Sequence, residues 1–226
     1  MQRIVSNEIL DSGLVSPQEL QTSFDDLWRI NRWFGGVSGT LQLLERVLAR
    51  TGLRAPRVLD VGGGDARLAA RLRDELGRRG VRSEFVVLDR NVSHLRVLAT
   101  PADAVLRVAA DALQPPFHDS SFDVVMCNLF LHHFSGPAAA SLLRAMLAMA
   151  GGAVVVNDLD RRLFAYLLIR YATFLTRSPI ARQDGAASVR QAYTPAEIAA
   201  MARETGAASF EVTRLPFLRT GLILWK

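Results

Sequence analysis

Three glycines, Gly62, Gly63 and Gly64, follow a short apolar run and precede a stretch with helical spacing that begins near Arg67. Glycine permits a tight turn and lets a ligand approach bare backbone, and a helix N-terminus offers free N–H groups. Such a turn at the carboxyl end of a parallel strand is where small ligands bind. A glycine turn without a ligand is the alternative. A dinucleotide is disfavoured, because Arg67 stands where the G-x-G-x-x-G pattern requires a small residue.

The glycine turn belongs to a D-x-G-x-G-x-A pattern that starts at Asp60 and resembles the first motif of class I S-adenosylmethionine-dependent methyltransferases. Acids or an amide follow the later apolar runs in the order typical of this family, at Asp89, Asp111 and Asn128. The resemblance covers about residues 57–160. It implies that Asp89 accepts the ribose hydroxyls of S-adenosylmethionine and that Asp111 receives the adenine amino group. The cofactor contacts that it implies are Asp60, Gly62, Gly63, Gly64, Asp89, Arg90, Asp111, Ala112 and Asn128.

Two adjacent histidines, His132 and His133, follow Asn128 and are expected to face the transferred methyl group. A phenol or enol acceptor must lose a proton during methyl transfer, which requires a base with a pKa near neutrality. Either histidine is a candidate base. The alternative is that one caps the next helix while the other packs on Phe134. No metal site is expected, because His118 and this pair, with scattered acids, lack the spacing of a ligand set.

A sheet must position these side chains. Short apolar runs alternate with amphipathic stretches from residue 57 to residue 157, which predicts a parallel sheet covered by helices on both faces. Two strands are expected to end the chain as an antiparallel pair, because their connection at Pro216 is short. The predicted fold is a Rossmann-like α/β domain with a mostly parallel seven-stranded sheet whose last strand is antiparallel. The predicted strands are 57–61, 84–89, 105–109, 122–128, 153–157, 209–215 and 217–225.

Helical segments are expected before and within this methyltransferase domain of residues 57–226. Residues 1–56 are predicted to form an N-terminal helical cap, whose two helices are separated at Gly35-Gly36. An insertion at about 158–193 is predicted to be a lid, with an apolar helix over 160–177 and an irregular stretch over 178–193. The capping-box pattern at Thr194 predicts the start of a further helix.

The nature of the acceptor rests on a weaker resemblance. Segments 31–36, 157–161 and 184–190 are similar to bacterial small-molecule methyltransferases of the ubiquinone/menaquinone and polyketide-tailoring branch. This resemblance implies a small phenolic, quinone-like or polyketide-type acceptor, with O-methylation slightly favoured over C-methylation. A lid helix that is apolar on nearly every face is either buried or covers an apolar substrate. The expected acceptor contacts are Trp33, Tyr166, Arg161 and Arg190.

The 226 residues include 27 basic and 22 acidic side chains, which gives a formal charge of +5. The excess is local, since residues 161–190 hold six arginines and one acid, Asp184. Nucleic acid is disfavoured as a partner, because the excess is confined to the lid and no basic stripe with interleaved aromatic residues accompanies it. A basic and apolar lid suits an amphiphilic or anionic acceptor, or transient contact with a membrane surface. Solvated arginines on a packed helix are the alternative.

Several classes of protein are disfavoured. No apolar run reaches the length of a bilayer span, and the first residues lack the pattern of a signal peptide. A single cysteine, Cys127, forms no internal disulfide, so a cytoplasmic location is expected. Two rival functions stay open: methylation of RNA or protein, and binding of S-adenosylmethionine without catalysis. The sequence does not specify the oligomeric state.

Overall fold

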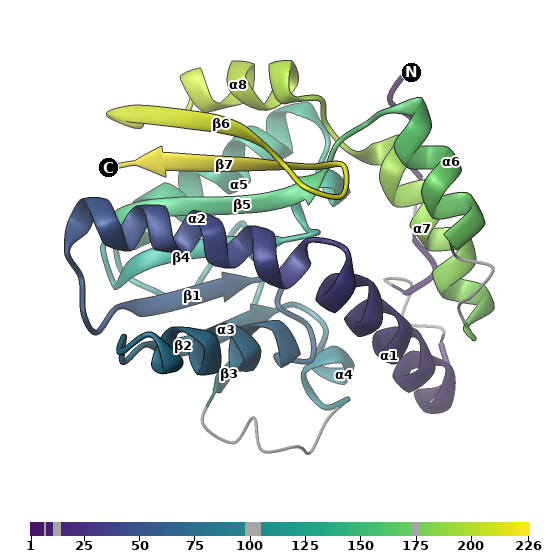
Figure 1. The fold of residues 1–226 in the computed structure, drawn as a ribbon, viewed down its shortest axis with the longest axis horizontal. Coiled ribbons are helices and arrows are strands. Elements are labelled where there is room, and N and C mark those ends of the chain that lie inside the picture. Colours follow the sequence, from purple (N-terminus) through teal and green to yellow (C-terminus); the bar gives the residue numbers. More distant parts are fainter. Residues whose placement is uncertain (7, 11–14, 98–104, 173–176) are drawn as a thin grey trace.

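Seven strands form one mixed sheet in the computed structural model, which describes residues 1–226 except 7, 11–14, 98–104 and 173–176 (Figure 1). The strand order is β3-β2-β1-β4-β5-β7-β6. Only β7 runs antiparallel to its neighbours, β5 and β6, so the predicted fold class is confirmed. The strands are β1 Arg57–Val61, β2 Glu84–Asp89, β3 Leu106–Ala109, β4 Phe122–Asn128, β5 Ala150–Leu159, β6 Ser209–Leu215 and β7 Arg219–Trp225.

Of the α-helices that the structure describes, two precede the first strand and the others lie between strands along the chain. Two of them start with capping boxes, formed by Ser16 with Glu19 and by Thr194 with Glu197, so the predicted start at Thr194 is confirmed. A 3-10 turn, Leu131–His133, follows β4. Within the described residues the α-helices are α1 Pro17–Trp33, α2 Gly36–Thr51, α3 Arg67–Arg78, α4 Val92–Leu95, α5 Gly136–Met149, α6 Leu163–Ala172, α7 Pro179–Gln191 and α8 Pro195–Arg203.

Alternate residues of the strands face two apolar clusters, one on each side of the sheet. Val58 and Val124 face the cluster that contains α2 and α3, whereas Leu59 and Val125 face the cluster that contains α5 and α8. Figure 1 shows α2 crossing in front of the sheet and α5 behind it. The central strands are buried on both faces, which is why they appear in the sequence as continuous apolar runs.

Residues 179–191 form helix α7, so the expectation of an irregular stretch over 178–193 was wrong. Ser178 is the N-cap, and its hydroxyl accepts a hydrogen bond from the backbone N–H of Ala181 at 3.2 Å. Pro179 occupies the first turn. The buried face of this helix has few large apolar residues, so its sequence shows only a weak helical periodicity. Its start has the same Ser-Pro pair as the start of α1.

The segment predicted to be a lid lies at the carboxyl ends of the parallel strands (Figure 1). Helices α1, α6 and α7 gather at this end of the sheet, on the right in Figure 1. The N-terminal residues run along α7: the N–H groups of Ile9 and Leu10 donate to the Asp184 carboxylate at 3.0 and 3.1 Å. The predicted 160–177 helix begins only at Leu163, and its residues 173–176 lie outside the described part. No described helix is long and apolar enough to cross a membrane.

Candidate active site

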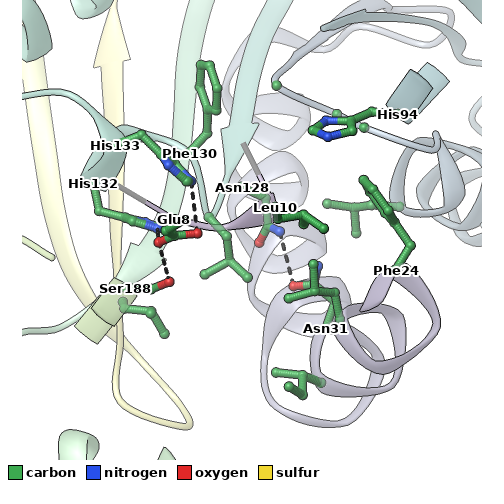
Figure 2. A pocket seen from close by; sticks show the side chains of 18 of the residues that line it. Glu8, Leu10, Phe24, Asn31, His94, Asn128, Phe130, His132, His133 and Ser188 are labelled. Atoms are coloured by element: carbon green, nitrogen blue, oxygen red, sulfur yellow. Dashed lines mark hydrogen bonds and ion pairs between the residues drawn. The ribbon is translucent and has the colours of Figure 1, made fainter. Parts of the chain in front are cut away.

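A cavity of about 970 Å³ lies where β1, β2 and β4 end. The loops after these strands contribute one wall, and residues of α1, α6, α7 and the N-terminal segment contribute the others. Figure 2 shows side chains from these separate segments converging on one space. The volume lies at the upper end of the range typical of ligand pockets, so it can hold a nucleoside-sized cofactor together with a small second ligand.

The glycine turn after β1 presents bare backbone to this cavity. Gly62 and Gly64 have φ angles of 71° and 54°, and the N–H of Gly64 donates to Oδ2 of Asp89 at 3.1 Å. A side-chain carbon at Gly62 would collide with the Phe130 ring, and one at Gly64 would come within 2.8 Å of the Phe24 ring. Backbone angle and space therefore both require glycine in this turn, the glycine cradle, on which the rings of Phe130 and Phe24 pack.

Asp60, the penultimate residue of β1, is a buried acid with no hydrogen-bond partner among the described residues. Its residue surface is 1% exposed, and both carboxylate oxygens are buried. Burial, followed by the negative charge of Asp89, raises the pKa of Asp60 to about 8. An isolated buried carboxyl is costly unless a ligand or cation pairs with it. Asp60 is therefore suited to a positively charged ligand in the adjacent cavity.

The residues implied as cofactor contacts come together as expected. Asp89 accepts the N–H of Asn91 at 2.8 Å through Oδ1, in addition to the bond from Gly64. Asp111 is exposed and accepts the N–H of Leu113 at 2.9 Å. All nine predicted contacts line the cavity: Asp60, Gly62, Gly63, Gly64, Asp89, Arg90, Asp111, Ala112 and Asn128.

His132 is buried between two carboxylates. Its Nδ1 lies 2.7 Å from Oδ1 of Asp158, and its Nε2 lies 3.5 Å from Oε1 of Glu8. Burial lowers the pKa of His132, but the charge and hydrogen bond of Asp158, aided by Glu8, raise it to about 10. At neutral pH the ring is therefore protonated. His132 cannot then accept a proton from an acceptor, which makes it unsuited to the role of general base.

His133 lies against His132 and is more open to the cavity. The two rings stack with centroids 4.4 Å apart, and 22% of the His133 side chain is exposed. Its Nε2 lies 3.9 Å from Oε2 of Glu8. Figure 2 shows Glu8 between the histidine pair and Ser188, whose hydroxyl donates to Oε1 of Glu8 at 2.6 Å. The expected histidine pair thus faces the cavity as one group with a carboxylate.

Glu8 was missed by the sequence analysis, and no local signal could have found it. It lies in a segment without clear periodicity, far along the chain from the histidines. Only the packing of the N-terminal residues along α7 brings it to them. Its burial raises the pKa of Glu8, but hydrogen bonding and charge from His132, then His133, lower it overall. The three residues are close enough that they could hold a metal ion, which the sequence spacing did not suggest.

The expected acceptor contacts are only partly brought together. Trp33 lines the cavity at its rim and is 65% exposed. Tyr166 packs in the apolar cluster between α6 and α7 and is not part of the cavity lining. Arg190 is exposed and also lies outside the lining.

Arg161 requires a correction, because it is a buried structural residue rather than a cavity residue. It donates to the carbonyls of Met1 and Ala192 at 3.0 and 3.1 Å and to Oε1 of Glu197 at 2.7 Å. Its neighbour Arg162 pairs with Asp160 at 2.6 Å. These partners use the charge of both arginines within the fold, so neither of these two charges is available to an acceptor in the cavity.

Arg219 and Asn31 are further cavity residues that the sequence analysis did not select. Arg219 on β7 is 1% exposed and donates to Oδ1 of Asn128 at 3.1 Å, to Oδ1 of Asn31 at 3.2 Å and to the Phe34 carbonyl at 2.7 Å. Burial lowers the pKa of Arg219 to about 10, although the charge of Asp158 opposes this effect. Its hydrogen bonds join the end of α1 and the turn that follows it, through Asn31 and Phe34, to Asn128 at the end of β4.

These features fit S-adenosylmethionine. Its sulfonium and ammonium groups are cationic, which suits the unpartnered Asp60 carboxyl. Its ribose offers hydroxyl donors, and the oxygens of Asp89 retain capacity to accept them. Its methionine and adenosine parts can lie along the glycine cradle, because all three glycines line the cavity.

Comparison with known proteins gives the family. A methyltransferase-domain family matches residues 58–151. The ubiquinone biosynthesis O-methyltransferase of Thiobacillus denitrificans is 31% identical over 183 residues, which cover 77% of this chain and 74% of that protein. That of Methylococcus capsulatus is 31% identical over 166 residues, or 72% and 68% of the two chains.

Solved structures show the same fold. A SAM-dependent methyltransferase from Aquifex aeolicus has a TM-score of 0.62 at 16% identity, covering 93% of this chain and 98% of that one. The plantazolicin methyltransferase BpumL in complex with SAH has a TM-score of 0.69 at 13% identity, covering 96% and 93%. The relatives and the shared fold show that the chain belongs to the class I S-adenosylmethionine-dependent methyltransferases, and S-adenosylmethionine is its cofactor.

Proposed function

We propose that the protein transfers a methyl group from S-adenosylmethionine to an oxygen atom of a small aromatic acceptor. One observation carries the proposal: a single cavity joins the glycine cradle to the group of Glu8, His132 and His133. The glycine cradle suits the cofactor, and the group of Glu8, His132 and His133 can accept the proton of an acidic hydroxyl. The name of the Thiobacillus denitrificans relative, an O-methyltransferase of ubiquinone biosynthesis, supports the same chemistry.

At the cofactor end, each assigned contact follows from its position. The Asp60 carboxyl pairs with a cationic group of the cofactor, because it is buried beside the cavity without another partner. Asp89 accepts from the ribose hydroxyls, and Asp111 accepts from the adenine amino group. The turn at Gly62 and Gly64 keeps the backbone open to the methionine part.

At the acceptor end, the histidines have different roles. Bound S-adenosylmethionine supplies a methyl group on an already activated sulfonium, so the protein has to align the acceptor, exclude water and accept a proton. His132 is protonated and paired with both Asp158 and Glu8. It thereby holds the Glu8 carboxylate beside His133. His133 is more open to the cavity and lies beside the Glu8 carboxylate. It is the group placed to take the proton.

The cavity walls support an aromatic and partly apolar acceptor. The cavity is lined by the rings of Phe24, Phe130 and Phe134. Two more lining residues, Trp33 and Phe217, are 65% and 51% exposed. Aromatic rings pack against a flat acceptor and exclude water from the transferring methyl group. Exposed rings at the rim suit an acceptor with an apolar portion that extends out of the cavity.

The experiment is a labelled-methyl assay with separate acceptor arms: a panel of catechols and simple phenols, total RNA, and a protein extract. We expect label in the phenolic panel. Label confined to RNA or protein, or binding of S-adenosylmethionine without transfer to any acceptor, would contradict the proposal. His133→Gln should lower kcat by about 10²- to 10⁴-fold with unchanged cofactor affinity. His118→Gln, at an exposed histidine, is the matched control and should leave both unchanged.

A further inference from the structure

We propose that Glu8, His132 and His133 form a binding site for a zinc ion at the acceptor end of the cavity. Each residue offers one ligand atom, and these atoms all lie within 4.8 Å of one another. Two imidazoles and one carboxylate are a typical ligand set of catalytic zinc sites, which keep a fourth position for water or substrate. All three residues line the cavity, so a fourth ligand can approach from that side.

The distances suit one small ion. Ligand atoms around tetrahedral zinc, at about 2.0 to 2.2 Å from the metal, lie roughly 3.3 Å from one another. Nε2 of His132 lies 3.5 Å from Oε1 of Glu8, and Nε2 of His133 lies 3.9 Å from Oε2 of Glu8. The two nitrogens face different oxygens of one carboxylate, the first at a separation that a zinc site can have and the second at a slightly longer one. Zinc binding would draw the ligand atoms together and would displace the proton from Nε2 of His132, which is protonated in the metal-free protein.

His132 provides a second and independent observation. Its Nε2 is fully buried and, among the described residues, meets only the Glu8 carboxylate, at 3.5 Å and outside hydrogen-bond geometry, although a buried polar atom normally has a hydrogen-bond partner. Its Nδ1 is held at 2.7 Å by the Asp158 carboxylate, whose oxygens also accept the backbone N–H groups of His132 and Leu159. A carboxylate that orients a histidine in this way is typical of metal sites, because it fixes the ring and directs the other nitrogen to the metal.

The surrounding residues favour a cation at this place. Glu8 and Asp158 are two buried carboxylates, and the ring of His132 lies between them. Ser188 donates to Oε1 of Glu8 at 2.6 Å and Gln191 donates to the same oxygen at 3.3 Å, so α7 fixes the carboxylate in place. Two nitrogen ligands favour zinc over magnesium, which prefers oxygen ligands. With zinc bound, His133 would ligate the ion and would not take the proton, and the ion would instead hold the acceptor oxygen and favour its ionised form.

The site is independent of the proposed O-methylation, because its test uses no acceptor. Tag-free protein is stripped with a chelator and titrated with Zn²⁺ in competition with a chromophoric chelator. Co²⁺ then serves as a spectroscopic probe, since its visible absorption reports tetrahedral coordination. We expect one Zn²⁺ for each chain, a tetrahedral Co²⁺ spectrum, and no displacement by equimolar Mg²⁺.

Variants decide whether these residues are the ligands. Glu8→Gln and His133→Gln should each weaken Zn²⁺ binding at least tenfold and remove the Co²⁺ spectrum. His118→Gln and Glu45→Gln, at exposed residues outside the cavity, should leave both unchanged. Calorimetry with S-adenosylmethionine and the thermal midpoint show that each variant is folded. Zn²⁺ affinity that is equal in wild type, Glu8→Gln and His133→Gln, or absence of stoichiometric Zn²⁺ binding by folded wild type, would overturn the site.

The two proposals fail separately. Zinc binding that depends on Glu8 and His133, together with label that appears only in RNA, would leave the metal site standing and refute the small-molecule function. Phenol methylation by a protein that binds no zinc would do the reverse.

Discussion

Replacing Asp60 by asparagine is expected to remove a pH dependence from the stability of the cofactor-free protein. Burial and the charge of Asp89 raise the pKa of Asp60 from 3.8 to about 8. Between these two values the unfolded chain loses the proton while the folded chain keeps it. The free energy of unfolding therefore falls as the pH rises through this window, and the contribution of Asp60 is complete only below pH 3.8.

The magnitude follows from the pKa values. Each pH unit inside the window costs about 1.36 kcal/mol, so Asp60 should lower the stability by roughly 3 kcal/mol between pH 5 and pH 7. Asparagine does not titrate, and all other titratable groups are the same in both proteins, so their contributions cancel in the difference. The difference in unfolding free energy between Asp60→Asn and wild type should consequently grow in favour of the variant as the pH rises. Above pH 8 the difference should level off.

Urea denaturation of both proteins at pH 5, 6, 7 and 8 measures this difference, with cofactor removed. Asp119→Asn, at an exposed acid, is the control and should follow wild type at every pH. Binding of cationic S-adenosylmethionine should release a proton from wild type at pH 7, which calorimetry in buffers of different ionisation heat detects. Asp60→Asn should bind the cofactor more weakly and release no such proton. Parallel stability curves for wild type and Asp60→Asn would refute the reasoning.

Three further perturbations test the cradle, the lid and the charge of the lid. Gly62→Ala should abolish cofactor binding, since its methyl group meets the Phe130 ring at a φ of 71°; unchanged calorimetric affinity would exclude the cradle. Ser178→Ala removes the N-cap of α7 and should lower the free energy of unfolding by about 1 to 2 kcal/mol in urea, and an unchanged midpoint would show that the cap is dispensable. Arg161→Gln should lower the thermal midpoint without raising the Michaelis constant, because this side chain binds Glu197 rather than the cavity; the opposite pattern would restore it as an acceptor contact.

The cofactor end could be predicted because its residues follow the strands in order. Asp60, Asp89 and Asn128 each end a short apolar run, and parallel strands bring their carboxyl ends to one edge of the sheet. The glycine turn has a conformational requirement that is visible in the sequence. Strand order, together with the resemblance to class I methyltransferases, therefore selected nine residues that all line one cavity.

The acceptor end could not be predicted in the same way, because it depends on packing between distant segments. Glu8 reaches the histidines only because Asp184 of α7 binds the neighbouring backbone at Ile9 and Leu10. The count of charges on the lid was correct, but it did not show that Arg161 is buried and paired. Charge along a sequence gives the sign of a segment, whereas the partners of each side chain depend on tertiary contacts.

The most direct test of the proposed function is to identify the acceptor atom that receives the methyl group. Reaction of the protein with S-adenosylmethionine labelled with ¹³C at the methyl group, and with a phenolic acceptor found in the assay above, gives a product whose carbon spectrum separates oxygen-bound from carbon-bound methyl groups. The histidine and glutamate group beside the cofactor predicts a methyl ether, and predicts that His133→Gln forms it far more slowly. A carbon-bound methyl group as the product, or a methyl ether formed equally fast by His133→Gln, would contradict the proposal.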